Sequence, residues 1–254
     1  IRDVAVTGVQ TCALPISILL AHKLTKGLAD DRKAGKVNFL RPDSKSQVSV
    51  VYENNIPQLV SAVVISTQHT PDANQKQITE YVREDLGPRV LGKWWSKDAT
   101  LYVNPTGDFS HGGPSADAGV TGRKIIVDSY GGWGRHGGGA FSGKDPSKVD
   151  RSSAYFCRYV ARQVVAAGLA RKAEIQVGYA IGMAKPVSVK VDTFGTGDEQ
   201  AAADFVMNAF DFRPRAIIDT LNLLRPIYRG TTNYGHFGRP GLPWETTAKV
   251  ATSR

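Results

Sequence analysis

The feature that most limits how this chain can fold is a glycine-dense segment near its middle. Residues 131–145 read GGWGRHGGGAFSGKD, so that nearly every second residue is glycine. Glycine lowers the stability of a helix or a strand interior, and it gives the backbone access to positive φ. We therefore expect an irregular loop here, with the regular elements on either side of it.

The residues before this loop predict one helix and a set of strands. Residues 17–33 have helical spacing of apolar side chains at Ile18, Ala21, Leu24 and Leu28. Apolar and polar residues then alternate at 37–40, 47–52 and 59–67, which predicts a strand followed by a hairpin. Asn54, Asn55 and Pro57 mark the turn of the hairpin.

A second helix and a long loop follow. Ile78, Tyr81, Val82 and Leu86 repeat at helical spacing, and Gly87 and Pro88 predict the helix end. Residues 104–122 are rich in Gly, Pro, Asp and Ser, which is typical of a loop and makes this stretch the best candidate boundary between two units.

The second half predicts another set of strands and helices. Residues 124–128 predict a short strand, and residues 147–169 a strong helix with Cys157, Val160, Ala161, Val164 and Val165 on one face. Residues 173–181 and 187–191 alternate as strands on either side of Pro186. Two last helices carry Phe205, Val206 and Ala209, then Ile217, Ile218, Leu221 and Leu224. We predict an α/β fold of the α+β type, with sheets covered on one face.

Length and composition exclude several classes of protein. A chain of 254 residues with 41% apolar residues can bury one large core or two modest ones. The apolar stretch at residues 16–20 is too short to cross a bilayer, so we expect no membrane span. Cys12 and Cys157 lack partners at zinc or disulfide spacing, which favours a reducing, cytoplasmic location.

A net charge of +9 indicates an anionic partner, which could be nucleic acid, an acidic membrane or a polyphosphate. Nucleic-acid binding proteins tend to have basic runs or basic residues interleaved with aromatic ones. Here Lys and Arg are spread along the chain and recur within glycine-rich or acidic motifs. A basic nucleic-acid-binding module is therefore the non-enzymatic alternative, and we expect no nucleic acid.

The first residues have an unusual origin in our interpretation. Residues 6–16, VTGVQTCALPI, match the in-frame translation of a common sequencing adapter, and they lack the pattern of a secretory signal or transit peptide. We therefore predict that residues 1–16 are not native and exclude them from fold reasoning. Cys157 is then the one native thiol.

The glycine-dense segment has the composition of a phosphate site. Glycines let backbone N–H groups approach a ligand closely, and Lys144 supplies a charge suited to phosphate. A flexible surface loop is the simpler alternative. Residues 138–144 also satisfy GxxxxGK, but Asp145 stands where a P-loop needs a hydroxyl for magnesium, and the preceding strand is far away. A P-loop NTPase is therefore the second enzymatic hypothesis.

Charged residues flank this segment. Arg123 and Lys124 precede it, and Lys148, Asp150 and Arg151 follow it. Cations bind polyphosphate oxygens, and a carboxylate can hold Mg²⁺ beside them. Asp150 could also simply favour the start of the next helix.

Several motifs together resemble one family. They are LRPDSKSQV at residues 40–48, GGP at 112–114 with DAGVTGRK at 117–124, HGGGAFSGKDPSKVDR at 136–151, and YGHFGR at 234–239. In order and spacing they closely resemble S-adenosylmethionine synthetase from about Ser17 to Trp244. The resemblance divides the chain into a central domain at 17–110, taken as partial, and a C-terminal domain at 111–254.

The resemblance implies a fold of repeated sheet-and-helix domains and a reaction in which the sulfur of L-methionine attacks C5′ of ATP. The triphosphate leaves and is cleaved to pyrophosphate and phosphate. The family uses Mg²⁺ and K⁺, and its active sites lie between the subunits of a homodimer or dimer of dimers. The reaction needs no general base, because positioning and cations lower the barrier.

The resemblance also assigns roles to residues. The ATP contacts are Asp43, Ser44, Lys45, Phe109, Asp117, Arg123, Lys124, Ala140 and Lys144. Lys45, Arg123, Lys124 and Lys144 are the catalytic cations, with Ala140 and Lys144 serving the ATP of the partner subunit. Asp117 and Lys148 contact methionine, and Asp150 holds magnesium.

Two departures from the family pattern matter. Asp108 stands where many relatives have Arg or another residue, so we assign it no ATP contact. The N-terminal His-Pro-Asp-Lys motif does not occur in this sequence, and we expect the chain as written not to make S-adenosylmethionine. From their own surroundings, the histidines are expected to form hydrogen bonds rather than bind metal, and Cys157 to be a packed apolar group.

Overall fold

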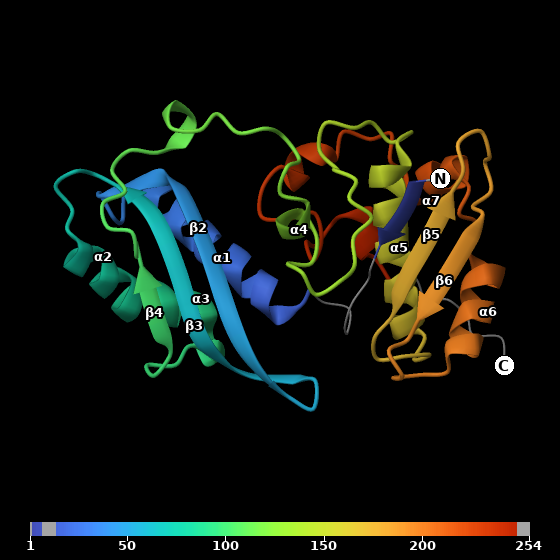
Figure 1. The fold of residues 1–254 in the computed structure, drawn as a ribbon, viewed down its shortest axis with the longest axis horizontal. Coiled ribbons are helices and arrows are strands. Elements are labelled where there is room, and N and C mark those ends of the chain that lie inside the picture. The colour runs from blue at the N-terminus through green and yellow to red at the C-terminus, as the bar shows by residue number, and fades with distance from the viewer. Residues whose placement is uncertain (1, 7–13, 248–254) are drawn as a thin grey trace. The chain divides into compact units, whose positions relative to one another are not determined.

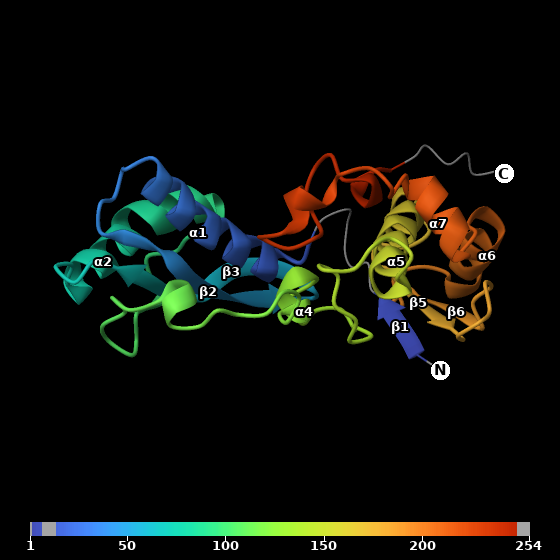
Figure 2. The same cartoon turned by 90° about the horizontal axis from the view of Figure 1, so that it is seen from above.

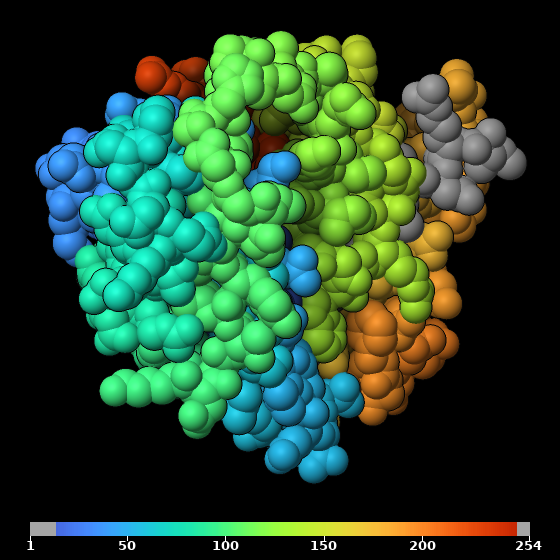
Figure 3. Space-filling model, turned by 60° about the vertical axis from the view of Figure 1, so that its left-hand side comes forward, coloured from blue at the N-terminus to red at the C-terminus, as the bar shows by residue number. Residues whose placement is uncertain are grey.

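A computed structural model describes the backbone of residues 2–6 and the whole of residues 14–247 (Figure 1). The chain divides into two compact units, residues 16–120 and residues 121–254 together with 1–15. The boundary between residues 120 and 121 falls within the loop that the sequence predicts at 104–122. Part of this loop lies at the surface in the space-filling view (Figure 3).

The unit of residues 16–120 is a three-stranded sheet with helices on one face (Figures 1 and 2). Its elements are α1 (Ile16–Lys33), β2 (Leu40–Glu53), β3 (Ile56–His69), α2 (Gln75–Tyr81), a π-helical turn (Val82–Leu86), α3 (Gly87–Leu91), 3₁₀ turns at Gly92–Trp94 and Gly113–Ser115, and β4 (Thr100–Val103). In the sheet order β2-β3-β4, β2 and β3 are antiparallel, and β4 is parallel to β3.

One core holds this unit together. Apolar side chains of α1, of the inward face of β2 and β3, and of the helices from Ile78 to Leu91 are buried in a single cluster. The four positions expected to face inward from the first helix are all buried: Ile18, Ala21, Leu24 and Leu28. The other face of the sheet leaves Val51, Leu59 and Tyr102 exposed.

The hairpin is confirmed, but its start is not where the sequence suggests. Asn54 and Asn55 form the turn with φ of 51° and 62°. Residues 37–39 form turns instead of the expected strand, which begins only at Leu40. Asp43 and Lys45, which fall between the stretches predicted as strands, lie within β2, where the pairing is irregular between Leu40 and Ser44. The sequence does not predict β4, because four residues carry too little alternation to be recognised.

The helix of Ile78 does not stop at Gly87 and Pro88, contrary to the prediction. The N–H of Gly87 donates to the carbonyl of Val82, five residues earlier, and the chain continues as α3. Proline is tolerated at the first positions of a helix because its missing N–H is not needed there. A Cβ on Gly87 would lie 2.5 Å from the Trp95 ring, so this glycine serves close packing rather than a helix end.

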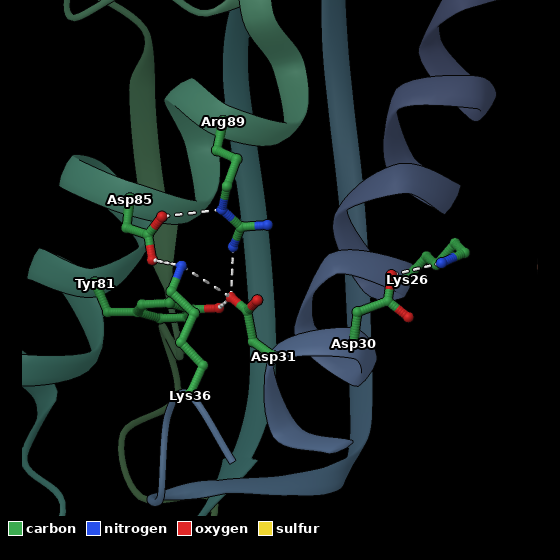
Figure 4. A network of polar contacts seen from close by, with 7 residues as sticks. All are labelled: Lys26, Asp30, Asp31, Lys36, Tyr81, Asp85 and Arg89. Atoms are coloured by element: carbon green, nitrogen blue, oxygen red, sulfur yellow. Dashed lines mark hydrogen bonds and ion pairs between the residues drawn. The ribbon is translucent and has the colours of Figure 1, made fainter. Parts of the chain in front are cut away.

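An ionic network fastens the end of α1 to the later helices (Figure 4). The buried carboxylate of Asp31 accepts from the Tyr81 hydroxyl at 2.5 Å and from the guanidinium of Arg89. Asp85 joins Arg89 to Lys36, with the Lys36 ammonium 2.5 Å from its carboxylate. Burial and the bond to Asp31 raise the pKa of Tyr81, so its hydroxyl stays a donor.

The unit that begins at residue 121 has its own antiparallel sheet, in the order β1-β5-β6. Its elements are β1 (Arg2–Val6), α4 (Ile125–Asp128), α5 (Val149–Ala166), β5 (Glu174–Tyr179), β6 (Ser188–Asp192), α6 (Glu199–Ala209), α7 (Pro214–Leu221) and 3₁₀ turns at Tyr228–Thr231 and Pro243–Glu245. Figure 1 shows α5 beside β5 and α6 beside β6. β1 comes from the segment that we excluded from fold reasoning, and it pairs with β5.

Most predictions for this unit are confirmed. The helix of residues 147–169 is α5, in which Cys157, Val160, Ala161 and Val164 are buried, and the two strands and two later helices are present. The strand expected at 124–128 is wrong. This stretch is the single helical turn α4, closed by the N–H of Asp128 donating to the carbonyl of Lys124 at 2.8 Å.

The C-terminal segment is anchored on α5 through a buried ion pair. Arg158 donates twice to Glu245, at 3.1 Å and 2.9 Å, and both side chains are almost fully buried. Glu245 also accepts from the backbone N–H of Gly238 at 2.7 Å. This carboxylate therefore ties residues 238–245 to the helix. Among the residues described, no helix is long and apolar enough to cross a membrane.

Candidate functional site

In the unit of residues 16–120, Asp43 links the edge of the sheet to the following loop. One carboxylate oxygen accepts from the N–H of Gly113 at 3.0 Å. The N–H of Asp43 donates to the side-chain oxygen of Gln68 at 3.4 Å, and the Gln68 amide donates to the carbonyl of Ser110 at 3.2 Å. The loop of residues 110–113 is thus held beside the first residues of β2.

Phe109 is held in the same place by the last residue of β3. The N–H of Phe109 donates to Nε2 of His69 at 3.1 Å, and the N–H of His69 donates to the carbonyl of Phe109 at 3.1 Å. Nδ1 of His69 lies 2.9 Å from the carbonyl of Thr70, so it carries the proton. This is the neutral tautomer, and the 3.6 Å approach of Nε2 to Asp108 is therefore not an ion pair.

The packing around Gly112 shows how closely these groups approach. A Cβ at Gly112 would lie 2.8 Å from the Phe109 ring and 3.3 Å from Oδ2 of Asp43. The structure therefore brings together two of the predicted ATP contacts, Asp43 and Phe109, around a backbone position that has no room for a side chain.

The remaining predicted contacts of this unit are not gathered with them. Ser44 pairs with the buried Thr67, whereas Lys45 pairs with Ser66 on the other face of the sheet. Their side chains therefore point to opposite faces, and both cannot reach one ligand from the same side. Asp117 is exposed and accepts from the N–H of Gly119 at 2.8 Å, with no described contact to Asp43 or Phe109.

In the other unit, the glycine-dense loop is folded against the start of α5. The ammonium of Lys144 lies 2.6 Å from Oδ2 of Asp150. A Cβ at Gly139 would lie 2.7 Å from the Asp150 side chain, and one at Gly122 would lie 3.0 Å from the Cβ of Ala140. Close backbone approach therefore gathers Ala140, Lys144 and Asp150.

Arg123 and Lys124 directly follow Gly122, which packs on this loop. Both side chains are exposed, and no hydrogen bond or ion pair of either is found within the described part of the chain. Arg123 and Lys124 are therefore two cations next to the glycine-dense loop that have no ion-pair partner among the described residues.

Lys148 borders an open cavity on the same unit. Its ammonium lies 3.3 Å from the carboxylate of Asp145. Hydrogen bonds from Ser147 and the charge of Lys148 lower the pKa of Asp145 to about 2. The cavity, of about 450 Å³, is lined by Ser147, Lys148, Val149, Asp150, Tyr179, Ala180, Ile181, Met183 and Pro214. It combines one cation and one carboxylate with mostly apolar walls.

A metal ion at Asp150 would need the substrate to supply most of its coordinating atoms. Within residues 14–247, no group of three His, Cys, Asp or Glu side chains could hold a metal ion. A single carboxylate is nevertheless sufficient where substrate phosphates and water complete the coordination of Mg²⁺. Asp150 fits that role because it lies beside the glycine-dense loop.

The P-loop hypothesis is wrong on structural grounds. A P-loop follows a strand and opens directly into a helix, which presents its N–H groups to the phosphates. Here the chain does not pass from Lys144 directly into a helix, because residues 145–148 come before α5 begins at Val149. The element before the loop is the helical turn α4 rather than a strand. The sheet of this unit is antiparallel throughout.

The sequence indicates Arg151 only as a charge flanking the loop and does not predict the buried polar cluster to which it belongs. The cluster consists of Arg151 and Tyr155 on α5 and His236 in the C-terminal segment. His236 belongs to the YGHFGR motif, for which the sequence predicts no contact partner. No local pattern indicates that this motif lies beside α5, because 81 residues separate Tyr155 from His236.

Comparison with known families gives a clear result. The family models of the S-adenosylmethionine synthetase central domain and C-terminal domain match residues 7–109 and 111–246. The chain belongs to the S-adenosylmethionine synthetase family. This confirms the predicted fold class, and the central-domain match begins inside the segment that we interpret as non-native.

A curated relative agrees with this assignment. The chain is 55% identical over 241 residues to a protein named S-adenosylmethionine synthase from Sorangium cellulosum (strain So ce56). The match covers 94% of this chain and 57% of the relative, so the chain spans little more than half the length of that synthase.

Proposed function

We propose that this chain carries the central and C-terminal parts of a methionine adenosyltransferase, which forms S-adenosylmethionine from ATP and L-methionine and releases pyrophosphate and phosphate. The observation that supports this most directly is the Lys144–Asp150 contact beside the glycine-dense loop, with the cavity of Lys148 adjoining it. Membership of the family and the 55% identical synthase support the same reaction.

The chemistry requires cations rather than a base. The methionine sulfur is a neutral nucleophile, so the barrier falls when the reactants are aligned and the charge that builds on the leaving triphosphate is stabilised. In the proposal, Lys45, Arg123, Lys124 and Lys144 supply this charge. Arg123 and Lys124 suit the role because their side chains have no partner in the described structure.

The substrate contacts are part of the proposal. Asp43 and Phe109 would contact ATP from one unit, with Ser44 acting through its backbone because its side chain faces the buried Thr67. Ala140 would line the nucleotide site. Asp117 would contact both the nucleoside and methionine, and Lys148 would bind methionine, whose thioether suits the apolar walls beside it.

Mg²⁺ and K⁺ are the proposed cofactors. Asp150 would hold Mg²⁺, which supplies positive charge to the triphosphate, and Lys144 would remain beside the same phosphates. For K⁺ we propose the requirement only, since we assign no residue of this chain to it.

We also propose that the chain assembles as a homodimer or dimer of dimers, with active sites between subunits. The uncovered face of its first sheet supports self-association, because Val51, Leu59 and Tyr102 leave apolar area exposed there. We expect a cytoplasmic protein with neither a nucleic-acid nor a membrane partner.

Product analysis tests the reaction. The part of the Sorangium relative that this chain does not match is joined to it, and the hybrid is incubated with ATP, Mg²⁺ and K⁺, with and without methionine. We expect S-adenosylmethionine, pyrophosphate and phosphate only with methionine, and none from the same hybrid carrying Lys144→Met. Equal release of ADP with and without methionine would instead indicate an ordinary NTPase.

A further inference from the structure

Arg151 is a buried cation with no anionic partner among the residues described. Its side chain is almost inaccessible, and no ion pair joins it to a described carboxylate. Its guanidinium instead donates to three neutral groups: the Tyr155 hydroxyl at 3.0 Å, the carbonyl of Lys144 at 2.8 Å and the Thr231 hydroxyl at 3.4 Å. The Tyr228 ring lies 4.2 Å from its central carbon.

The hydrogen bond from Arg151 leaves the Tyr155 proton free for a second hydrogen bond. A guanidinium can only donate, so the Tyr155 oxygen accepts from Arg151 and can give its own proton to another acceptor. Nδ1 of His236 lies 2.7 Å from this oxygen and is in position to accept it. Burial, together with the charges of Arg151 and Arg239, lowers the pKa of His236 to about 3, so the ring is neutral at pH 7. When Nδ1 accepts from Tyr155, the proton of this neutral ring is on Nε2.

Nε2 of His236 faces the glycine-dense loop. It lies 3.4 Å from the Ser142 hydroxyl, to which it can donate. Ser142 and Lys144 flank Gly143, whose φ of 85° is favourable only for glycine. Arg151 thus reaches the loop on both sides of this bend, directly at Lys144 and through Tyr155 and His236 at Ser142.

We propose that Arg151 is a positioning residue that holds the stretch from Ser142 to Lys144, and that Tyr155 sets the His236 tautomer that donates to Ser142. A loop of glycines is otherwise free to sample many conformations, and each would move the Lys144 ammonium. The proposal deepens the proposed function, since the held cation is the one assigned to the triphosphate.

The tautomer is measured directly by ¹⁵N NMR of the histidine ring in the full chain. We expect the Nε2–H form of His236 at pH 7, and its loss or mixing with the Nδ1–H form in Tyr155→Phe. Tyr159→Phe is the matched control on the same helix, because no hydrogen bond of its hydroxyl is found in the described structure. An Nδ1–H ring in the unmodified chain would overturn the proposed direction.

Hydrogen exchange of the backbone amides at residues 142–145 measures how firmly the loop is held. We expect exchange roughly 10-fold faster in Arg151→Lys, which loses the fork that reaches Lys144, and in Tyr155→Phe, which loses the link that orients His236 toward Ser142. Arg151→Lys keeps the charge but loses the planar fork. Exchange in Arg151→Lys equal to that of the unmodified chain would show that charge alone acts, and would overturn the positioning role.

Binding of inorganic tripolyphosphate connects the loop to the proposed function. We expect the dissociation constant to rise about 5- to 30-fold in Tyr155→Phe and to stay unchanged in Tyr159→Phe. If the unmodified chain fails to bind tripolyphosphate, the proposed phosphate site fails, whereas the tautomer and the exchange rates still decide the positioning role. Unchanged affinity and exchange in Tyr155→Phe would overturn it.

Discussion

The Lys144 ammonium and the Asp150 carboxylate lie 2.6 Å apart, and both side chains are partly exposed. An ion pair this accessible contributes little to folding, roughly 0 to 1 kcal/mol. The two groups are six residues apart, and Gly139 packs directly on Asp150. Stability alone therefore does not account for the pair, and in the proposed function the two groups are parts of one ligand site.

This relationship predicts different effects for its two members. Lys144→Met should weaken ATP binding about 10- to 100-fold with or without Mg²⁺, because it removes a charge-assisted bond to phosphate. Asp150→Asn should weaken it mainly when Mg²⁺ is present. Isothermal titration calorimetry in both conditions measures this, with the exposed Lys76→Met as control. Equal loss in both conditions for Asp150→Asn would contradict a metal role.

The Arg158–Glu245 pair predicts a large effect on stability. Glu245→Ala leaves the buried guanidinium of Arg158 without its carboxylate and should lower the free energy of unfolding by about 3 to 5 kcal/mol. Urea denaturation measures this. Glu199→Ala, in the exposed first turn of α6, should change it by less than about 1 kcal/mol. A loss below about 1 kcal/mol for Glu245→Ala would show that the C-terminal segment is not anchored by this pair.

The lowered pKa of His236 predicts that the free energy of unfolding decreases in acid. Its pKa is lowered to about 3 in the folded chain, whereas in the unfolded chain it has the ordinary value of about 6.5. Below pH 6.5 the unfolded state binds the proton and the folded state does not, so stability decreases as pH falls toward 3. From pH 6.5 to 5 the loss is about 2 kcal/mol.

The contribution of His236 can be isolated by comparing how strongly the free energy of unfolding depends on pH in two variants. Free energies of unfolding measured between pH 7 and 5 should depend less on pH in His236→Gln than in the unmodified chain. His136, whose pKa is also lowered by burial, is the matched comparison, and His136→Gln should retain the His236 contribution. An unchanged slope in His236→Gln would mean that the ring takes up a proton in the folded chain.

The Cys157 thiol should react very slowly with thiol reagents in the folded protein. The thiol is fully buried on α5, and burial raises its pKa to about 12, so almost no reactive thiolate exists at pH 8. In a Cys12→Ser variant, labelling by a thiol reagent should be at least about 100-fold slower in buffer than in denaturant. Fast labelling of Cys157 under native conditions would show that α5 opens readily.

Periodicity and turn residues determined most elements from the sequence alone. α1, the β2–β3 hairpin, α5 and the two later helices all have enough residues for their apolar spacing to be unambiguous. The motifs around Lys144 indicated the family, because residue types at fixed spacing can be recognised without knowledge of the fold. Local patterns failed where the element was short, as at β4 and α4, or where packing on Trp95 used Gly87 for another purpose.

Tertiary structure alone decided which of the predicted residues meet. It placed Asp43 and Phe109 next to each other around Gly112, and it turned the side chains of Ser44 and Lys45 to opposite faces of one strand. It also brought His236 against Tyr155 and Arg151, across a long separation in sequence. Sequence spacing is a local property, whereas a buried hydrogen-bond chain exists only after collapse has brought distant segments together and excluded water.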